Sequence, residues 1–322
     1  AVVLYAQQYG SRLEDARSFQ MYLGGSSGNV AFGCARLGLR SAMITRVGNE
    51  QMGRFLIKTL SDEGCDVSQI KVDPEHMTAL AILGIKDRQT FPLLFYRDNC
   101  ADMAFCPDDV NESFIADCMA LHITGTHFST PQVRAGSLRA LEYAHAHNVR
   151  TVLDIDYRPV LWGLTTPGDG KTRYIPSPDV TARFQEILCE FDLIVGTEEE
   201  FHIAGGSTDT LQALAQVRAV SKATLVCKRG ALGCSVYTDA IPPRLDDGLT
   251  VTGVRVEVLN VLGAGDAFMS GLLRGYLNDE GWEQACRYAN ACGALVVSRH
   301  GCAPAMPGKI ELDDYLSRAA QV

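Results

Sequence analysis

The stretch 260–271 constrains the fold most, because it joins a predicted strand to a predicted helix through a glycine-rich turn. Before it, residues 254–258 alternate valine with charged residues, which predicts a strand with one buried face. After it, apolar and small residues recur over 268–276 at the spacing of one helix face, with glycines where close packing is needed. Strand, tight turn and helix in this order are typical of an α/β protein.

The turn itself consists of Gly263, Ala264 and Gly265, and it falls at the predicted helix start. Free backbone N–H groups and the positive end of the helix dipole favour an anion there, and residues without bulk let a phosphate approach. Asp266 follows directly. It either simply opens the helix as a carboxylate in the first turn, or acts as the base for a hydroxyl that attacks a phosphoryl group. The local residues leave both interpretations open.

Strand-like and helix-like segments alternate along most of the 322 residues. Apolar runs predict strands at 41–47, 120–124, 150–155, 192–195 and 223–227, and helix-like segments lie at 30–37, 52–60 and 136–146. Polar residues collect after several strand ends, where ligands bind in open parallel sheets. We therefore predict a doubly wound, mostly parallel sheet with helices on both faces, in a single domain spanning 1–322.

Two apolar runs interrupt this alternation and predict a small separate sheet. Residues 79–85 and 91–95 are joined by the polar residues 86–90, as in a β-hairpin. Together with strand-like residues near the N-terminus they would form a β-lid from about 2–23 and 78–102, which excludes water. Arg97 follows the hairpin. It either binds an anionic group on the substrate or forms a surface ion pair with Asp98.

Two further helix starts carry polar residues with two interpretations each. The glycine-rich run 24–29 enables Asn29 and backbone amides to bind a polar ligand, but its Ser and Asn residues also suit helix capping. In the acidic run 198–200, Glu200 either opens a helix or helps hold a hydrated Mg²⁺ ion near phosphates. His127, alone after a strand, is expected to be structural.

Composition limits the class of protein. A net charge of −9 argues against a nucleic-acid-binding surface. No stretch reaches the ~18 uncharged apolar residues of a membrane span. The 11 cysteines are odd in number and lack metal-ligand spacing, so we expect reduced thiols in a cytoplasmic protein. The chain begins without Met in a strand-like run, which leaves open whether residues precede it.

Five stretches, in order, resemble the ribokinase-like (PfkB-type) carbohydrate kinases, which include fructokinases and 2-keto-3-deoxygluconate kinases. They are 24–29, 48–53, 154–158, 197–200 and 263–266, and the resemblance covers nearly the whole chain. It implies a ribokinase-like fold and a phosphotransferase with an alcohol group as acceptor. By the same resemblance, Gly263, Ala264 and Gly265 form the anion hole for the transferred phosphoryl group, and Asp266 is the catalytic base.

The resemblance also implies binding roles for other residues. Gly25, Asn29 and Asn49 would face the sugar, and Glu200 would organise magnesium. The residues expected around the nucleotide are Lys228, Gly230, Gly233 and Asn290. ATP and Mg²⁺ are the implied cofactors, and a monovalent cation such as K⁺ stays open.

Three departures from the family pattern point to a narrower branch. The usual Asp-Thr before the glycine turn is Asn260-Val261, the Asn that starts the magnesium motif is Thr197, and the usual Asp after Gly48 is Asn49. None removes the base or the anion hole, so we expect activity. The runs 12–15, 95–102, 124–129 and 154–162 resemble the branch that phosphorylates 5-dehydro-2-deoxygluconate in myo-inositol breakdown.

We therefore expect ATP-dependent phosphorylation of the terminal hydroxyl of 5-dehydro-2-deoxy-D-gluconate, with Arg97 and Arg158 as candidates for its carboxylate. Val3 stands where that branch often carries an Asp, which leaves the exact sugar acid open. The alternatives are a 2-keto-3-deoxygluconate kinase, a fructokinase, or a non-catalytic sugar- or nucleotide-binding sensor. The expected partners are the sugar acid and ATP, with no nucleic acid or membrane. An exposed edge of the lid sheet favours a homodimer or higher homo-oligomer.

Overall fold

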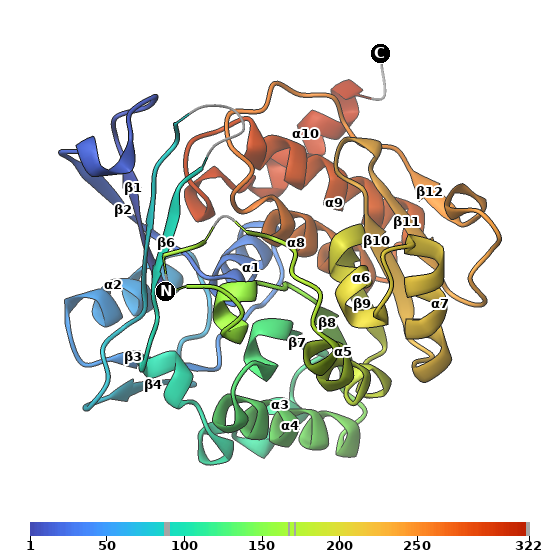
Figure 1. The fold of residues 1–322 in the computed structure, drawn as a ribbon, viewed down its shortest axis with the longest axis horizontal. Helices are drawn as coiled ribbons and strands as arrows, with labels where there is room; N and C mark the ends of the chain where they lie inside the picture. The colour runs from blue at the N-terminus through green and yellow to red at the C-terminus, as the bar shows by residue number, and fades with distance from the viewer. Residues whose placement is uncertain (87–90, 167, 171, 320–322) are drawn as a thin grey trace. The chain divides into compact units, whose positions relative to one another are not determined.

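The computed structural model describes residues 1–86, 91–166, 168–170 and 172–319. These residues form two compact units. The first unit contains 1–86, 91–105, 168–170 and 254–319, so it combines early and late parts of the chain, and the second contains 106–166 and 172–253. Figure 1 shows the chain coloured from its N-terminus to its C-terminus. The predicted single domain over 1–322 stays a prediction.

The second unit is built on a six-stranded, mostly parallel sheet, which confirms the predicted fold class. Its strands are β7 (Ala120–Thr124), β8 (Arg150–Asp154), β9 (Leu193–Thr197), β10 (Thr224–Lys228), β11 (Cys234–Tyr237) and β12 (Leu249–Val251). They lie in the order β12-β11-β10-β9-β8-β7. The strands from β7 to β10 are parallel, whereas β11 and β12 are antiparallel additions at one edge.

Helices of the second unit pack around this sheet. They are α3 (Glu112–Ala116), α4 (Pro131–Ala146), α5 (Pro178–Gln185), α6 (Glu198–Gly205) and α7 (Thr210–Val220). Phe184 of α5 and Phe201 of α6 are fully buried in a core shared with the sheet. In β9, the consecutive residues 193–195 are all buried, as expected where both faces of a sheet are covered.

The first unit contains the helix that follows the glycine turn. Its helices are α1 (Ser26–Arg36), α2 (Gln51–Asp62), α8 (Ala264–Leu277), α9 (Trp282–Val297) and α10 (Lys309–Ala319). Helix α8 packs along α9 and against α1, so early and late parts of the chain lie side by side (Figure 1). A Cβ atom on Gly275 would lie 2.4 Å from the Ala285 Cα, which explains the glycine on this helix face.

The predicted small sheet is present in the first unit. It consists of β1 (Val2–Ala6), β2 (Phe19–Leu23), β5 (Leu80–Leu83) and β6 (Leu93–Tyr96), in the order β2-β1-β5-β6. Strands β5 and β6 pair antiparallel as the predicted hairpin, while residues 87–90 of its predicted turn lie outside the described residues. A second, two-stranded sheet pairs β3 (Thr45–Gly48) with β4 (Ile70–Asp73) in parallel.

Three boundaries differ from the sequence prediction. Residues 254–258 form no strand, although the valines are half-buried and the charged residues exposed, because here the chain only passes from the second unit to the first. Helix α1 begins at Ser26, before the predicted 30. The predicted strand 41–47 is a ladder only over β3, with an isolated bridge between Ala42 and Asp66. Within the described ranges, no helix is both long and apolar enough to cross a membrane.

Candidate active site

The glycine turn, Gly263 to Gly265, starts helix α8 as predicted. Gly263 is the N-cap residue and has a φ of 84°, in the left-handed region that favours glycine. A Cβ atom at this position would also lie 3.2 Å from the Cys302 Cβ. Asp266 therefore lies in the first turn of α8, beside the backbone N–H groups of the helix start.

Two side chains of α1 hold the Asp266 carboxylate. Ser26 Oγ donates a hydrogen bond to Oδ1 at 2.8 Å, and Asn29 Nδ2 donates one to Oδ2 at 2.7 Å. These contacts join two of the predicted stretches and fix the orientation of the carboxylate. Sequence reasoning did not predict Ser26. The available signal was its spacing, because residues three apart on a helix share one face.

Asn29 has an additional capacity for hydrogen bonding. The residue is only 3% exposed, and its Oδ1 atom has no hydrogen-bond partner in the described structure. A buried amide oxygen without a partner is uncommon and calls for an explanation, such as a ligand or a water. Its position next to Asp266 suits a substrate hydroxyl that donates to this oxygen.

Asn260 ties the segment before the glycine turn to a neighbouring loop. Its side chain is fully buried, its Nδ2 donates to the Arg299 carbonyl at 2.7 Å, and its Oδ1 accepts from the Leu262 N–H at 3.0 Å. The departure from the family's usual Asp at this position thus has a structural role of its own.

The other predicted sugar-facing residues of the first unit lie at helix starts and near the small sheet. Gly25 is the exposed N-cap residue of α1, with a φ of 84°. Asn49 is exposed in the loop between β3 and α2. Arg97 does not pair with Asp98, as one interpretation expected. Its Nε donates to Asp102 Oδ2 at 2.6 Å, and both side chains are largely buried.

In the second unit, charged residues gather at and just after the carboxyl ends of β8, β9 and β10. Lys228 Nζ donates to Asp154 Oδ1 at 3.0 Å and lies 3.5 Å from Glu200 Oε2. Arg158 lies 3.0 Å from Asp156 Oδ1 and 3.6 Å from Glu200 Oε1. We call these five residues the charge cluster. Parallel strands bring them together, because their carboxyl ends meet at one edge of the sheet.

Burial and opposite charges compete in this cluster. Burial alone would lower the pKa of Lys228, but the Asp154 and Glu200 carboxylates raise it above its ordinary value. For Glu200, burial acts to raise the pKa, yet Lys228 and Arg158 hold it below its ordinary value. Burial raises the pKa of Asp156, with Arg158 opposing and Asp154 adding to the effect. Perturbed pKa values in one cluster are typical of functional sites.

Asp156 carries a second sign of function, a strained backbone. Its φ of 35° is positive, which is uncommon for a residue other than glycine, and only 7% of its surface is exposed. Strained backbone persists where the surrounding structure imposes it, and such residues gather at active sites.

Glu200 opens helix α6, which realises one of its two predicted interpretations. Its carboxylate accepts from the Thr197 N–H at 2.7 Å, and the Thr197 hydroxyl accepts from the Glu200 N–H, as in a capping box. The described residues contain no group of three or more His, Cys, Asp or Glu arranged to hold a metal. Magnesium commonly takes only one or two protein carboxylates plus substrate phosphates, so Glu200 still fits as a single ligand.

The predicted nucleotide-binding residues fall in both units. Lys228 ends β10, and Gly230 and Gly233 follow it with φ values of 56° and 92°. A Cβ atom on Gly233 would lie 2.0 Å from the Val251 carbonyl oxygen, so glycine is required there. Asn290 lies on α9 in the first unit and is 8% exposed.

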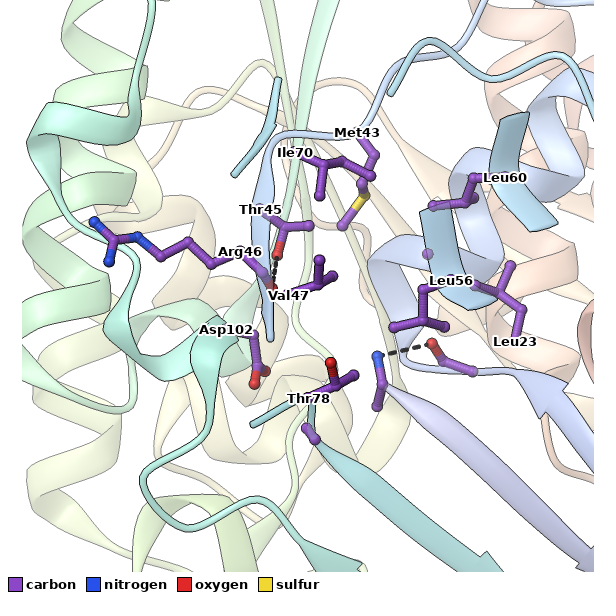
Figure 2. Close-up of a pocket in the computed structure, with 14 residues that line it drawn as sticks. Leu23, Met43, Thr45, Arg46, Val47, Leu56, Leu60, Ile70, Thr78 and Asp102 are labelled. Atoms are coloured by element: carbon purple, nitrogen blue, oxygen red, sulfur yellow. Dashed lines mark hydrogen bonds between the residues drawn. The ribbon is translucent and has the colours of Figure 1, made fainter. Parts of the chain in front are cut away.

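A small pocket in the first unit is lined in part by Gly24 and Gly28 of the run 24–29 and by Asp102, the partner of Arg97. Figure 2 shows its lining, with Leu56, Leu60 and Ile70 among the apolar side chains, and the Arg46 side chain pointing away from them. Its volume is about 40 Å³. Ligand pockets typically measure roughly 300–1,000 Å³, so this pocket suits water and not a sugar.

The chain belongs to the pfkB family of carbohydrate kinases, whose family profile it matches over residues 2–309. It is therefore a phosphotransferase that acts on an alcohol group of a carbohydrate. The whole chain is 33% identical to the 5-dehydro-2-deoxygluconokinase 1 of Bacillus cereus, over 330 aligned positions that cover 93% of that relative.

Solved structures share the fold. The chain resembles a fructokinase from Vibrio cholerae O395 in a form bound to fructose, ADP and calcium, with a TM-score of 0.80 and 25% identity, covering 98% of this chain and 96% of that one. It also resembles an aminoimidazole riboside kinase from Salmonella enterica complexed with aminoimidazole riboside and an ATP analogue. There the TM-score is 0.79, with 23% identity and coverage of 98% and 97%. The ribokinase-like fold is thereby confirmed.

Proposed function

We propose that this carbohydrate kinase transfers the γ-phosphoryl group of ATP to the terminal hydroxyl of 5-dehydro-2-deoxy-D-gluconate. The observation that carries the reaction is the Asp266 carboxylate, oriented by Ser26 and Asn29 at the glycine-rich start of α8. The choice of sugar acid is supported by the name of the full-length relative from Bacillus cereus.

In the proposed reaction, Asp266 accepts the proton of the substrate hydroxyl while the hydroxyl oxygen attacks the γ-phosphorus in line. The backbone N–H groups of the glycine turn and the dipole of α8 stabilise the charge on the phosphoryl oxygens. Ser26 and Asn29 keep the carboxylate from rotating, so the base is in place before the substrate arrives. The Asn29 Oδ1 atom accepts a hydrogen bond from the sugar.

The cofactor roles are part of the same proposal. Lys228, Gly230, Gly233 and Asn290 bind the nucleotide. Glu200 helps hold Mg²⁺, which when bound neutralises phosphate charge. Arg97 and Arg158 remain our candidates for binding the substrate carboxylate. That carboxylate would have to replace Asp102 as the partner of Arg97, or Asp156 as the partner of Arg158. We place the reaction in the cytoplasm, in keeping with the 11 free cysteines.

A substrate panel tests the proposal. ADP formation is measured with 5-dehydro-2-deoxygluconate, 2-keto-3-deoxygluconate and fructose, with Mg²⁺ present or chelated, and in potassium or sodium salts. We expect the highest kcat/KM for 5-dehydro-2-deoxygluconate, no activity without Mg²⁺, and higher activity in potassium if a monovalent cation contributes. If fructose exceeds both acids, the chain is a fructokinase and the roles of the two arginines are wrong.

We also propose that the chain forms a homodimer through the face of its four-stranded sheet that carries Met21, Leu4 and Ile82. The pairing register places Met21, Leu4 and Ile82 in one apolar row across β2, β1 and β5. On the same face, Phe19 is 41% and Tyr96 57% exposed. Both lie on edge strands, which are prone to pairing unless covered.

Light scattering after gel filtration checks this surface. Met21→Lys places a charge at the edge-strand end of the apolar row, so we expect the dimer of the wild type to become a monomer. Met77→Lys is the matched control, because Met77 is 69% exposed outside the sheet and its substitution leaves a dimer unchanged. A monomeric wild type, or a Met21→Lys dimer as tight as the wild type, contradicts the proposal.

A further inference from the structure

A buried contact lies directly behind the glycine turn. Cys302 packs so closely on Gly263 that a Cβ atom there would be 3.3 Å from the Cys302 Sγ. Cys302 is only 1% exposed. Its thiol is hydrogen-bonded to the hydroxyl of Tyr5, with a distance of 2.6 Å between sulfur and oxygen. Through this thiol, strand β1 is linked to the N-cap of the helix that carries Asp266.

The orientation of the Tyr5 side chain is determined by its surroundings. Tyr5 is fully buried, and its ring meets those of Tyr22 and His300 edge-on, with centroid distances of 5.3 Å and 5.4 Å. It shares a hydrophobic cluster with Leu83, Cys302 and the partly buried Leu262. Tyr5 thus has little freedom to move without the sheet and the turn moving with it.

The loop 299–302, which contains Cys302, makes a second contact with the segment that leads into the glycine turn. The Asn260 side chain donates to the Arg299 carbonyl, three residues before Cys302. The stretch from Asn260 to Gly263 is therefore held at both ends by the loop 299–302. These two contacts restrict the glycine turn to one position, which a preorganised anion hole requires.

We propose that Tyr5 and Cys302 are positioning residues for phosphoryl transfer. They fix the place of Gly263, aim the N–H groups of the glycine turn, and link that turn to the four-stranded sheet. The inference rests on the proposed role of the turn as an anion hole. Donors aimed at developing charge act mainly in the transition state, so their misplacement lowers kcat more than it raises KM.

Steady-state kinetics of matched variants test the inference. Tyr5→Phe keeps the ring and removes only the hydroxyl, so we expect kcat to fall roughly tenfold, the size of one lost hydrogen bond, with both KM values nearly unchanged. Cys302→Ala gives a similar loss. Cys302→Ser keeps a group that can bond Tyr5 and restores most of the activity. The kcat of the double variant Tyr5→Phe with Cys302→Ala is no lower than that of Cys302→Ala alone, because the two substitutions remove the same hydrogen bond.

The controls separate positioning from packing. Tyr22→Phe alters a neighbouring ring of the same sheet, and Cys292→Ala alters a buried thiol of α9, and neither changes kcat appreciably. Thermal unfolding checks that each variant is folded. The inference is overturned if folded Tyr5→Phe keeps the wild-type kcat or changes only KM. It is also overturned if the kcat losses of Tyr5→Phe and Cys302→Ala multiply in the double variant. Absence of phosphoryl transfer by the wild type on every sugar would instead overturn the proposed function.

Discussion

Asp266→Asn lowers kcat by ~10²–10⁴-fold, the usual loss when a single catalytic base is removed. The substitution preserves the shape of the side chain. The new amide oxygen can accept from Asn29 Nδ2, and the new amide nitrogen can donate to Ser26 Oγ, because a hydroxyl both donates and accepts. The local structure is therefore retained while proton acceptance is lost, and we expect KM values close to those of the wild type.

Measurement of ADP release with the preferred sugar checks this prediction. Asp62→Asn is the control, since Asp62 is an exposed carboxylate at the end of α2. It keeps the wild-type kcat. Equal activity of Asp266→Asn and the wild type would remove Asp266 from the mechanism and favour another base.

Lys228→Met destabilises the protein by about 3–5 kcal/mol, the usual effect of breaking a buried ion pair from one side. Lys228 is 11% exposed at its side chain, and its ammonium group lies between Asp154 and Glu200. Methionine replaces the volume of the side chain but leaves these two buried carboxylates without that cation. Urea unfolding at pH 7 gives the difference in the free energy of unfolding.

The loss of stability caused by Lys228→Met depends on pH in a defined direction. In the wild type, Glu200 has a lowered pKa, so its contribution to stability is present above the ordinary carboxyl pKa and declines as pH falls. Without Lys228 much of that contribution is absent, and protonation of the carboxylates relieves the buried charge. The gap between wild type and variant therefore narrows as pH falls from 7 towards about 4.

Lys222→Met is the matched control, because Lys222 is exposed in the same unit, shortly before β10. A surface substitution of this kind changes stability by no more than about 0.5 kcal/mol. A loss for Lys228→Met as small as the control, or one that grows as pH falls, would show that the cluster does not depend on this lysine.

Local patterns predicted the elements that position the site. The apolar run 193–195 became a buried strand, and the runs near 80 and 93 became the antiparallel pair β5 and β6. The glycine turn became the start of α8, with Asp266 in its first turn. Each of these features depends on neighbouring residues, on backbone freedom at glycine and on the period of burial.

Predictions whose outcome depended on residues elsewhere in the fold were wrong or incomplete. The alternation over 254–258 matched a strand, but it reflects one-sided burial of a connecting segment. Arg97 pairs with Asp102 instead of Asp98. Burial alternates along 254–258 in the same way whether or not a neighbouring strand forms hydrogen bonds with it. The flexible Arg97 side chain can pair with any carboxylate that the fold brings near.

The sequence by itself determined the class of this protein, because the glycine turn, Asp266 and the companion stretches are short local motifs that in this order resemble the carbohydrate kinases. Tertiary structure alone decided how the base is held and what lies behind the turn. Ser26 and Asp266 are 240 residues apart, and Tyr5 and Cys302 are 297 residues apart. Such contacts form only when α1 packs on α8 and β1 packs near the last loop, and no local pattern encodes which side chains meet there.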